Sequence, residues 1–80
     1  MFYVYIIKSE KTRKYYVGST NNLNKRIEEH NTGKSKYTSK GIPWDLIYYE
    51  IYLTRTLAMK KEKEIKSRGI KRYLEDQVEK

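Results

Sequence analysis

One short segment, FYVYIIK from Phe2 to Lys8, constrains the fold of this 80-residue chain more than any other. Its aromatic and β-branched residues favour a β-strand. In an extended segment Phe2, Val4 and Ile6 point to one side and the residues between them to the other. Because both sides are apolar or aromatic, we expect this strand to be the central one of a small sheet.

The rest of the chain divides into extended and helical segments of similar size. Thr20 or Asn21 would cap a first helix and Thr54 a second one, and Gly69 separates the second helix from a third. The other expected elements are a hairpin loop at 9–13, a second strand at 14–19, a first helix ending near 30 or 31, a polar loop at 34–42, a third strand at 45–53, a second helix ending near 67 and a third helix at 70–77. The order β-β-α-β-α-α predicts a single α+β domain over residues 1–80, with helices packed over a small sheet.

The composition excludes several classes of protein. Because the chain has no cysteine, neither a disulfide framework nor a thiolate metal site can form. No apolar run approaches the ~20 residues of a membrane-spanning helix, and the N-terminus lacks the features of a secretory signal peptide. We therefore expect a cytoplasmic protein that does not enter a membrane.

A net charge of +8 indicates a polyanionic partner, with nucleic acid the first candidate and an anionic membrane surface the second. The alternative is a basic domain without such a partner. The residues expected to contact nucleic acid are Lys34, Lys36 and Lys40 in the polar loop, and Lys60, Lys61, Lys63, Lys66 and Arg68 in the second helix. Gly18 joins this set, because the absence of a Cβ lets a substrate backbone or another segment approach closely; a plain turn glycine is the alternative.

The first helix carries two polar residues beside its apolar stripe. Counting i, i+3, i+4 and i+7 from Leu23 collects Arg26, Ile27 and His30. Arg26 and His30 therefore flank the buried side of the helix. Each is either a functional side chain or a boundary residue that keeps its polar end in water.

The second helix has a carboxylate on its buried stripe. Ala58, Glu62 and Ile65 share one side at i, i+4 and i+7. A carboxylate placed there is costly unless a cation meets it. That cation is either Arg26, which would make a structural ion pair, or a divalent metal.

Several motifs together resemble the GIY-YIG nuclease family. YVY at Tyr3–Tyr5 and YVG at Tyr16–Gly18 are similar to the two halves of the family signature. NNLNKRIEEHN resembles the helix that follows the signature, and PWDLIYYE and AMKKEKEIKSR resemble the third strand and the helix that carries the metal-binding glutamate. The resemblance extends over essentially the whole chain. It implies a three-stranded antiparallel sheet flanked by helices, as in the small single-domain members and the nuclease domain of the excision-repair incision subunit.

The resemblance also implies an activity and a set of site residues. The family hydrolyses phosphodiester bonds with one divalent ion, which would be Mg²⁺ or Mn²⁺ here. The residues that match the family's catalytic positions are Tyr5, Tyr16, Arg26, His30 and Glu62, with Glu62 as the metal ligand. The implied substrate is DNA more than RNA, structured or damaged DNA included, and a protein partner could supply specificity.

The chain departs from the family at two points, of which the first costs little because position 3 carries packing, and the second keeps another function open. Tyr3 stands where the first motif has glycine, and no asparagine follows Asn31, although many active members have one near the end of the domain. The missing asparagine favours a basic nucleic-acid-binding module that does not cut, whereas the presence of Tyr16, Arg26 and Glu62 favours an enzyme. A small protein-interaction domain with an incidental basic surface is the third alternative.

Overall fold

The computed structural model describes residues 1–78. Within them the chain forms three strands, three α-helices and one short 3₁₀ turn, in the expected order β-β-α-β-α-α. The elements are β1 (Phe2–Ser9), β2 (Tyr15–Thr20), α1 (Leu23–Asn31), η1 (Ser39–Gly41), β3 (Trp44–Tyr52), α2 (Arg55–Arg68) and α3 (Ile70–Val78).

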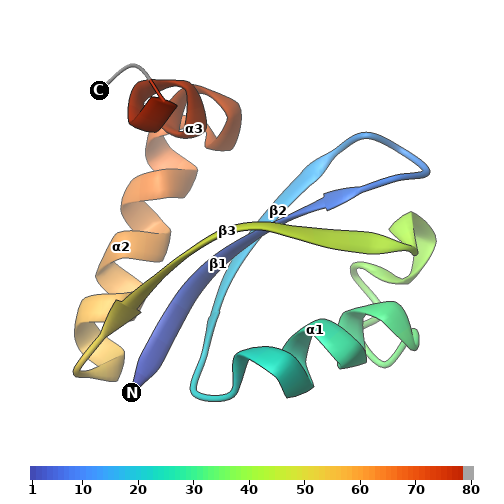
Figure 1. The fold of residues 1–80 in the computed structure, drawn as a ribbon, viewed down its shortest axis with the longest axis horizontal. Helices are drawn as coiled ribbons and strands as arrows, with labels where there is room; N and C mark the ends of the chain where they lie inside the picture. Colours follow the sequence, from blue (N-terminus) through green and yellow to red (C-terminus); the bar gives the residue numbers. More distant parts are fainter. Residues whose placement is uncertain (79–80) are drawn as a thin grey trace.

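The three strands form one antiparallel sheet with the order β2-β1-β3. The apolar strand β1 lies in the middle, which confirms the expectation drawn from its two apolar faces. Tyr5 pairs with Gly18 of β2 on one side and with Tyr49 of β3 on the other. The sheet is strongly twisted, and its strands cross the centre of the molecule in Figure 1.

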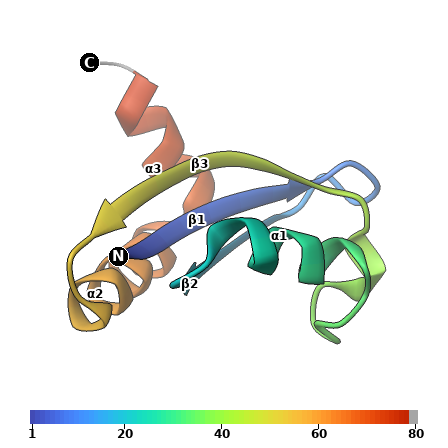
Figure 2. The same cartoon turned by 60° about the horizontal axis from the view of Figure 1, so that its bottom comes forward.

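Helices cover both faces of the sheet, so the domain has three layers. On one face Val4, Ile6 and Val17 pack against Ala58 and Ile65 of α2. On the other face Tyr5, Ile7 and Trp44 form a second apolar cluster, which Leu23 and Ile27 of α1 cover. Figures 1 and 2 show α1 on the opposite side of the sheet from α2 and α3. The two faces of β1 thus serve two separate cores.

The structure corrects the expected start of the first helix. The N-cap of α1 is Asn22, whose side chain accepts a hydrogen bond from the backbone N–H of Lys25, instead of Thr20 or Asn21. Thr20 cannot serve as the cap because it is still paired with Tyr3 in the sheet. The second cap was predicted correctly, since Thr54 accepts a hydrogen bond from the Leu57 N–H at the start of α2.

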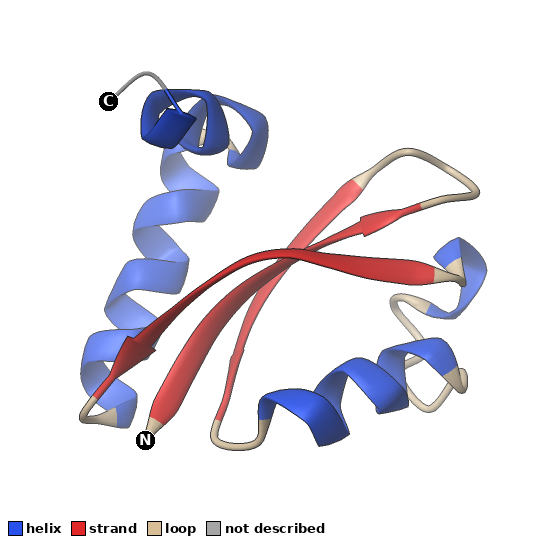
Figure 3. Cartoon of the chain, viewed as in Figure 1, coloured by secondary structure: helices blue, strands red, loops and turns tan. Residues whose placement is uncertain are grey.

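The expected polar loop between α1 and β3 has some regular structure of its own. It contains the helical turn η1, which Figure 3 shows just before β3. β3 starts one residue earlier than expected, at Trp44. The Trp44 indole N–H donates to the Thr38 carbonyl oxygen over 2.7 Å, so the loop is tied to the start of the strand.

Among the described residues, no helix combines the length and the apolar character needed to cross a membrane.

Candidate active site

A chain of hydrogen bonds runs through the core under α1. The Tyr5 hydroxyl lies 2.8 Å from Nε2 of His30, and Nδ1 of His30 lies 2.7 Å from Oγ1 of Thr38. Thr38 in turn donates to the Ser35 carbonyl oxygen over 3.4 Å. Tyr5, His30 and Thr38 are all buried. Both ring nitrogens of the histidine therefore have protein partners and neither faces water.

Burial sets the protonation states of this chain. It lowers the pKa of His30 to about 4, with help from the positive charge of Arg26. Burial also raises the pKa of Tyr5 to about 12, although Arg26 opposes the rise. At neutral pH the imidazole is then uncharged and the phenol keeps its proton. The consistent assignment has Tyr5 donating to Nε2 and Nδ1–H donating to Thr38.

Gly18 leaves the space that the Tyr5 ring occupies. A Cβ built on Gly18 would lie 2.6 Å from the Tyr5 hydroxyl oxygen and 2.8 Å from Cζ. Both contacts are too short for any side chain, so glycine is required at this position. The sequence suggested that either a substrate backbone or another segment approaches Gly18 closely. In the structure the approaching group is the Tyr5 side chain of β1. Gly18 itself is buried.

Tyr16 lies next to this chain on the same face of the sheet. Its ring meets the imidazole of His30 edge-on, with 5.2 Å between the centroids, and lies 6.4 Å from the ring of Trp44. The exposed ring of Tyr37 covers its other side at 5.7 Å. Tyr16 is half-buried, so it connects the buried Tyr5–His30 pair with the surface.

Arg26 supplies the positive charge of the site, near Tyr5. Its guanidinium donates to Glu29 over 3.1 Å, and the side chain is 34% exposed. The nearby Tyr5 hydroxyl is the largest cause that raises the pKa of Arg26. The guanidinium is thus paired with Glu29, lies near Tyr5 and still reaches solvent, where an anion could meet its free N–H groups.

Glu62 approaches from the other face of the sheet, past the edge of β2. Its Oε1 accepts from the Ser19 hydroxyl over 2.9 Å, and its Oε2 lies 2.9 Å from Nζ of Lys66. The ion pair between Glu62 and Arg26, which the sequence left open, does not form. Arg26 instead pairs with Glu29, one turn along its own helix. The Glu62 side chain keeps 21% of its surface exposed, and its charge adds slightly to the raised pKa of Tyr5.

The metal-binding capacity of this site is small. The part of the chain that the structure describes contains no group of three or more His, Asp or Glu side chains that could enclose a metal ion. Mg²⁺, however, is often held by one or two carboxylates with water and substrate phosphate as its other ligands. The partly exposed carboxylate of Glu62 fits such an open site, since Lys66 is more than half exposed and can move away.

The basic residues expected to contact nucleic acid divide into two groups. Lys34, Lys36, Lys40, Lys60, Lys63 and Lys66 are exposed. Lys61 is half-buried, lies over the Tyr73 ring at 5.0 Å and pairs with Glu64 over 3.1 Å; Arg68 is exposed but pairs with Asp76 of α3. Those two side chains take part in helix–helix packing as well as adding positive charge.

Sequence reasoning missed three side chains at this site. Ser19 could have been found, because it lies two residues after Val17 on one strand and therefore faces α2 with it. Thr38 and Tyr37 lie in a loop, where no periodic pattern indicates which side chain turns inward. The structure brings Tyr5 and Tyr16 of the sheet together with Arg26 and His30 of α1. Glu62 lies at the edge of β2.

The fold and the sequence match a known class of protein. The family model of the GIY-YIG catalytic domain matches residues 1–73, so the chain belongs to this nuclease family. Its relatives include UPF0213 protein SH2523 of Staphylococcus haemolyticus, 44% identical over 81% of this chain and 79% of the relative, and UPF0213 protein HQ_3675A of Haloquadratum walsbyi, 39% identical over 81% and 73%. The solution structure of the UPF0213 protein BH0048 from Bacillus halodurans superposes with a TM-score of 0.55 at 31% identity, covering 98% of this chain and 82% of the other.

Proposed function

We propose that this protein is an endonuclease that hydrolyses phosphodiester bonds in DNA with one divalent metal ion. The observation that carries the proposal is the convergence of Tyr5, Tyr16 and Arg26 on one face of the sheet, with Glu62 at the edge of β2. This set offers a phosphate-binding cation, the half-buried Tyr16 and a partly exposed carboxylate, with the buried Tyr5 hydroxyl near the cation.

Arg26 is the group proposed to bind the scissile phosphate. Its guanidinium pairs with Glu29, lies near Tyr5 and remains partly exposed. A guanidinium fork can donate two hydrogen bonds to the non-bridging oxygens, where negative charge builds up as the phosphorus is attacked. Because Arg26 is already positioned before substrate binds, little reorganisation is needed during the reaction.

Tyr5 and His30 are proposed to act as a pair. Neutral His30 accepts a hydrogen bond from the Tyr5 hydroxyl, which leaves the phenolic oxygen free to accept one from Arg26. His30 is fully buried, so its proposed part is to hold Tyr5, and through Tyr5 the guanidinium, in place. It acts as a positioning residue and does not need to meet the substrate.

Tyr16 is proposed as the general base. It is half-buried and lies against His30 and Trp44, so its ring is held firmly while its face toward Tyr37 is near the surface. A base must reach the attacking water directly or through one further water. Among the hydroxyls of this cluster Tyr16 is the better placed for this task, because Tyr5 is buried and bonded to His30.

Glu62 would hold the metal ion, which when bound supplies positive charge for the phosphate and the leaving oxygen. The exposed lysines of the α1–β3 loop and of α2 are proposed to bind the flanking phosphates. Their contribution would be insensitive to sequence, because phosphate contacts carry no base information.

A second candidate function is a nucleic-acid-binding module that does not cut. One observation favours it: Lys66 pairs with the carboxylate that a metal would need. The two functions separate in a cleavage assay on duplex, branched and single-stranded DNA, with Mg²⁺, with Mn²⁺ and with EDTA. The proposed enzyme cleaves at least one substrate only with metal, whereas the binding module retards the DNA and leaves it intact.

A further inference from the structure

Tyr37 is an aromatic side chain that the proposed chemistry leaves unused. It lies in the loop between α1 and η1 and is 83% exposed, more than any other large apolar side chain in the described part of the chain. Its ring lies against that of Tyr16, with 5.7 Å between the centroids and 49° between the planes. One flat ring is thus presented to solvent directly beside the proposed general base.

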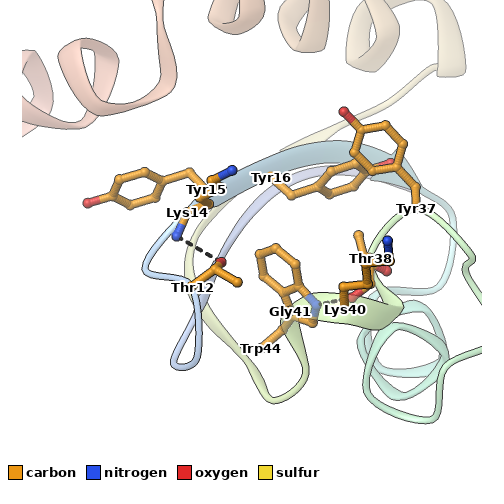
Figure 4. A pocket seen from close by; sticks show the side chains of 9 residues that line it. All are labelled: Thr12, Lys14, Tyr15, Tyr16, Tyr37, Thr38, Lys40, Gly41 and Trp44. Carbon is orange, nitrogen blue, oxygen red and sulfur yellow. Dashed lines mark hydrogen bonds between the residues drawn. The ribbon is translucent and has the colours of Figure 1, made fainter.

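Two hollows in the surface meet at this pair of rings. The first has a volume of ≈ 370 Å³, and Tyr16, Tyr37 and Trp44 form its aromatic lining. Figure 4 shows these rings together with the side chains of Lys14 and Lys40 around the same hollow. The second hollow, of ≈ 470 Å³, is lined by Tyr16 and Tyr37 again and by Lys66, which is the partner of Glu62. A continuous strip of surface therefore leads from Glu62 past Tyr16 to Tyr37 and the first hollow.

The chemistry of this strip matches a nucleotide strand with exposed bases. Aromatic rings supply stacking surfaces, the hydroxyl of the exposed Thr12 can exchange hydrogen bonds with a base edge, and the lysines can meet phosphates. No Asp or Glu lines either hollow, so nothing there repels a polyanion. A second copy of this chain, with a charge of +8, is a poor occupant of a surface rimmed by lysines.

We propose that Tyr37 stacks on an unpaired nucleobase of the DNA strand whose backbone crosses the site, so that the protein selects single-stranded or unpaired segments. The inference deepens the proposed function and rests on its nucleic-acid-binding part. In a duplex each base is stacked on its neighbours, and its faces are not free to meet Tyr37. An unpaired base can turn toward the aromatic rings while its own phosphate lies toward Arg26 and Glu62.

The test measures binding in EDTA, so that no cleavage is required. Fluorescence anisotropy gives Kd for a short single strand, for its perfect duplex and for a duplex with an unpaired bulge. Trp44 is the only tryptophan of the chain and lines the first hollow, so quenching of its fluorescence reports entry of a base. For wild type we expect tighter binding and stronger quenching with the single strand and the bulge than with the perfect duplex.

Three variants test whether the Tyr37 ring causes the preference for unpaired bases. Tyr37→Ala should weaken single-strand binding about 5- to 150-fold, as expected for the loss of one stacked base, and should change duplex binding little. Tyr37→Trp retains a stacking ring and should retain the preference. Tyr49→Ala removes another exposed tyrosine, one that lines neither hollow, and should leave both affinities unchanged if a thermal melt shows that it is folded.

Equal affinities of wild type and Tyr37→Ala for the single strand, with no Trp44 quenching, would overturn the inference. A cleavage assay run in parallel separates this failure from failure of the proposed function. If the protein cleaves DNA and Tyr37→Ala has no effect, the proposed nuclease function stands and the stacking site is rejected. If Tyr37→Ala weakens single-strand binding but no cleavage occurs, the stacking site stands and the proposed nuclease function is rejected.

Discussion

The Tyr5 hydroxyl lies 2.8 Å from Nε2 of His30, and both side chains are fully buried between the sheet and α1. This contact is made across 25 positions of the chain. It fixes the phenolic oxygen that also faces Arg26. The buried, neutral His30 thus contacts the tyrosine that lies near the partly exposed guanidinium of Arg26. Protonation of His30 would therefore affect both the candidate site and the stability of the fold.

The first prediction concerns the pH dependence of stability. The folded pKa of His30, about 4, is below the ordinary value of 6.5, so the unfolded chain takes up a proton first as the pH falls. The free energy of unfolding should therefore decrease between about pH 6.5 and pH 4, by up to about 3 kcal/mol from this group.

His30→Gln is the matched variant for that measurement. A glutamine amide can accept from Tyr5 and donate to Thr38 but cannot take up a proton. Urea unfolding of both proteins across this pH range should give a steeper curve for wild type, and the carboxylates contribute equally to both. Parallel curves would show that His30 titrates normally in the folded protein.

The second prediction concerns Tyr16. Tyr16→Phe keeps the ring contacts with His30 and Trp44 and removes only the hydroxyl. If that hydroxyl is the general base, the cleavage rate should fall about 10²–10⁴-fold, while Kd for DNA stays nearly constant. Single-turnover cleavage beside an anisotropy titration measures both quantities. An undiminished rate would reduce Tyr16 to a packing residue.

The third prediction concerns Arg26. Arg26→Lys keeps a positive charge and loses the planar fork that Glu29 and Tyr5 orient. We expect a clear loss of single-turnover rate, with DNA binding reduced much less. Equal rates for Arg26→Lys and wild type would mean that only the charge matters and that the positioning by Tyr5 has no catalytic consequence.

The fourth prediction separates stability from function. The Glu50 carboxylate accepts hydrogen bonds from Tyr48, Tyr52 and Tyr73. Burial alone would raise the pKa of Glu50, but these three donors outweigh it and lower the pKa. Glu50→Gln should reduce the free energy of unfolding by about 1.5–3 kcal/mol, as measured by urea unfolding. The folded variant should bind and cleave DNA like wild type, because Glu50 lines neither hollow; an altered Kd would connect this cluster with the DNA-binding surface.

Particular residues show how far the sequence predicted the structure. The two apolar faces of Phe2–Lys8 correctly predicted a central strand, because burial on both faces is a local property of the sequence. The stripe of α2 correctly placed Glu62 toward the sheet, but periodicity does not show which residue lies opposite. The partner turned out to be Ser19, with Lys66 one turn further along the helix.

The same limit applies to the residues around His30. Its position on the helix predicted a flanking side chain, yet complete burial depends on Thr38, which arrives from a loop. Side chains in a loop do not alternate with a fixed period, so the sequence does not show which of them points into the core. Tyr37 is next to Thr38 in the chain and faces solvent, and only the three-dimensional structure distinguishes these two neighbours.

Glu62 gives the most direct test of the proposed nuclease. The measurement is the cleavage rate of wild type, Glu62→Gln and Glu64→Gln with Mg²⁺ or Mn²⁺, together with the melting temperature of each protein with and without the metal. Glu62→Gln keeps the size of the side chain and its hydrogen bond with Ser19 while removing the charge that a metal needs. Glu64→Gln is the control, since Glu64 lies on the exposed side of the same helix and pairs with Lys61.

We predict that wild type and Glu64→Gln cleave DNA and are stabilised by the metal, and that Glu62→Gln does neither while it remains folded and still binds DNA. The contrary result is a wild-type protein without metal-dependent cleavage or stabilisation, and a Glu62→Gln variant that differs from it only by a lower melting temperature. Glu62 would then be a structural partner of Lys66 and Ser19, and the protein would bind nucleic acid without cutting it.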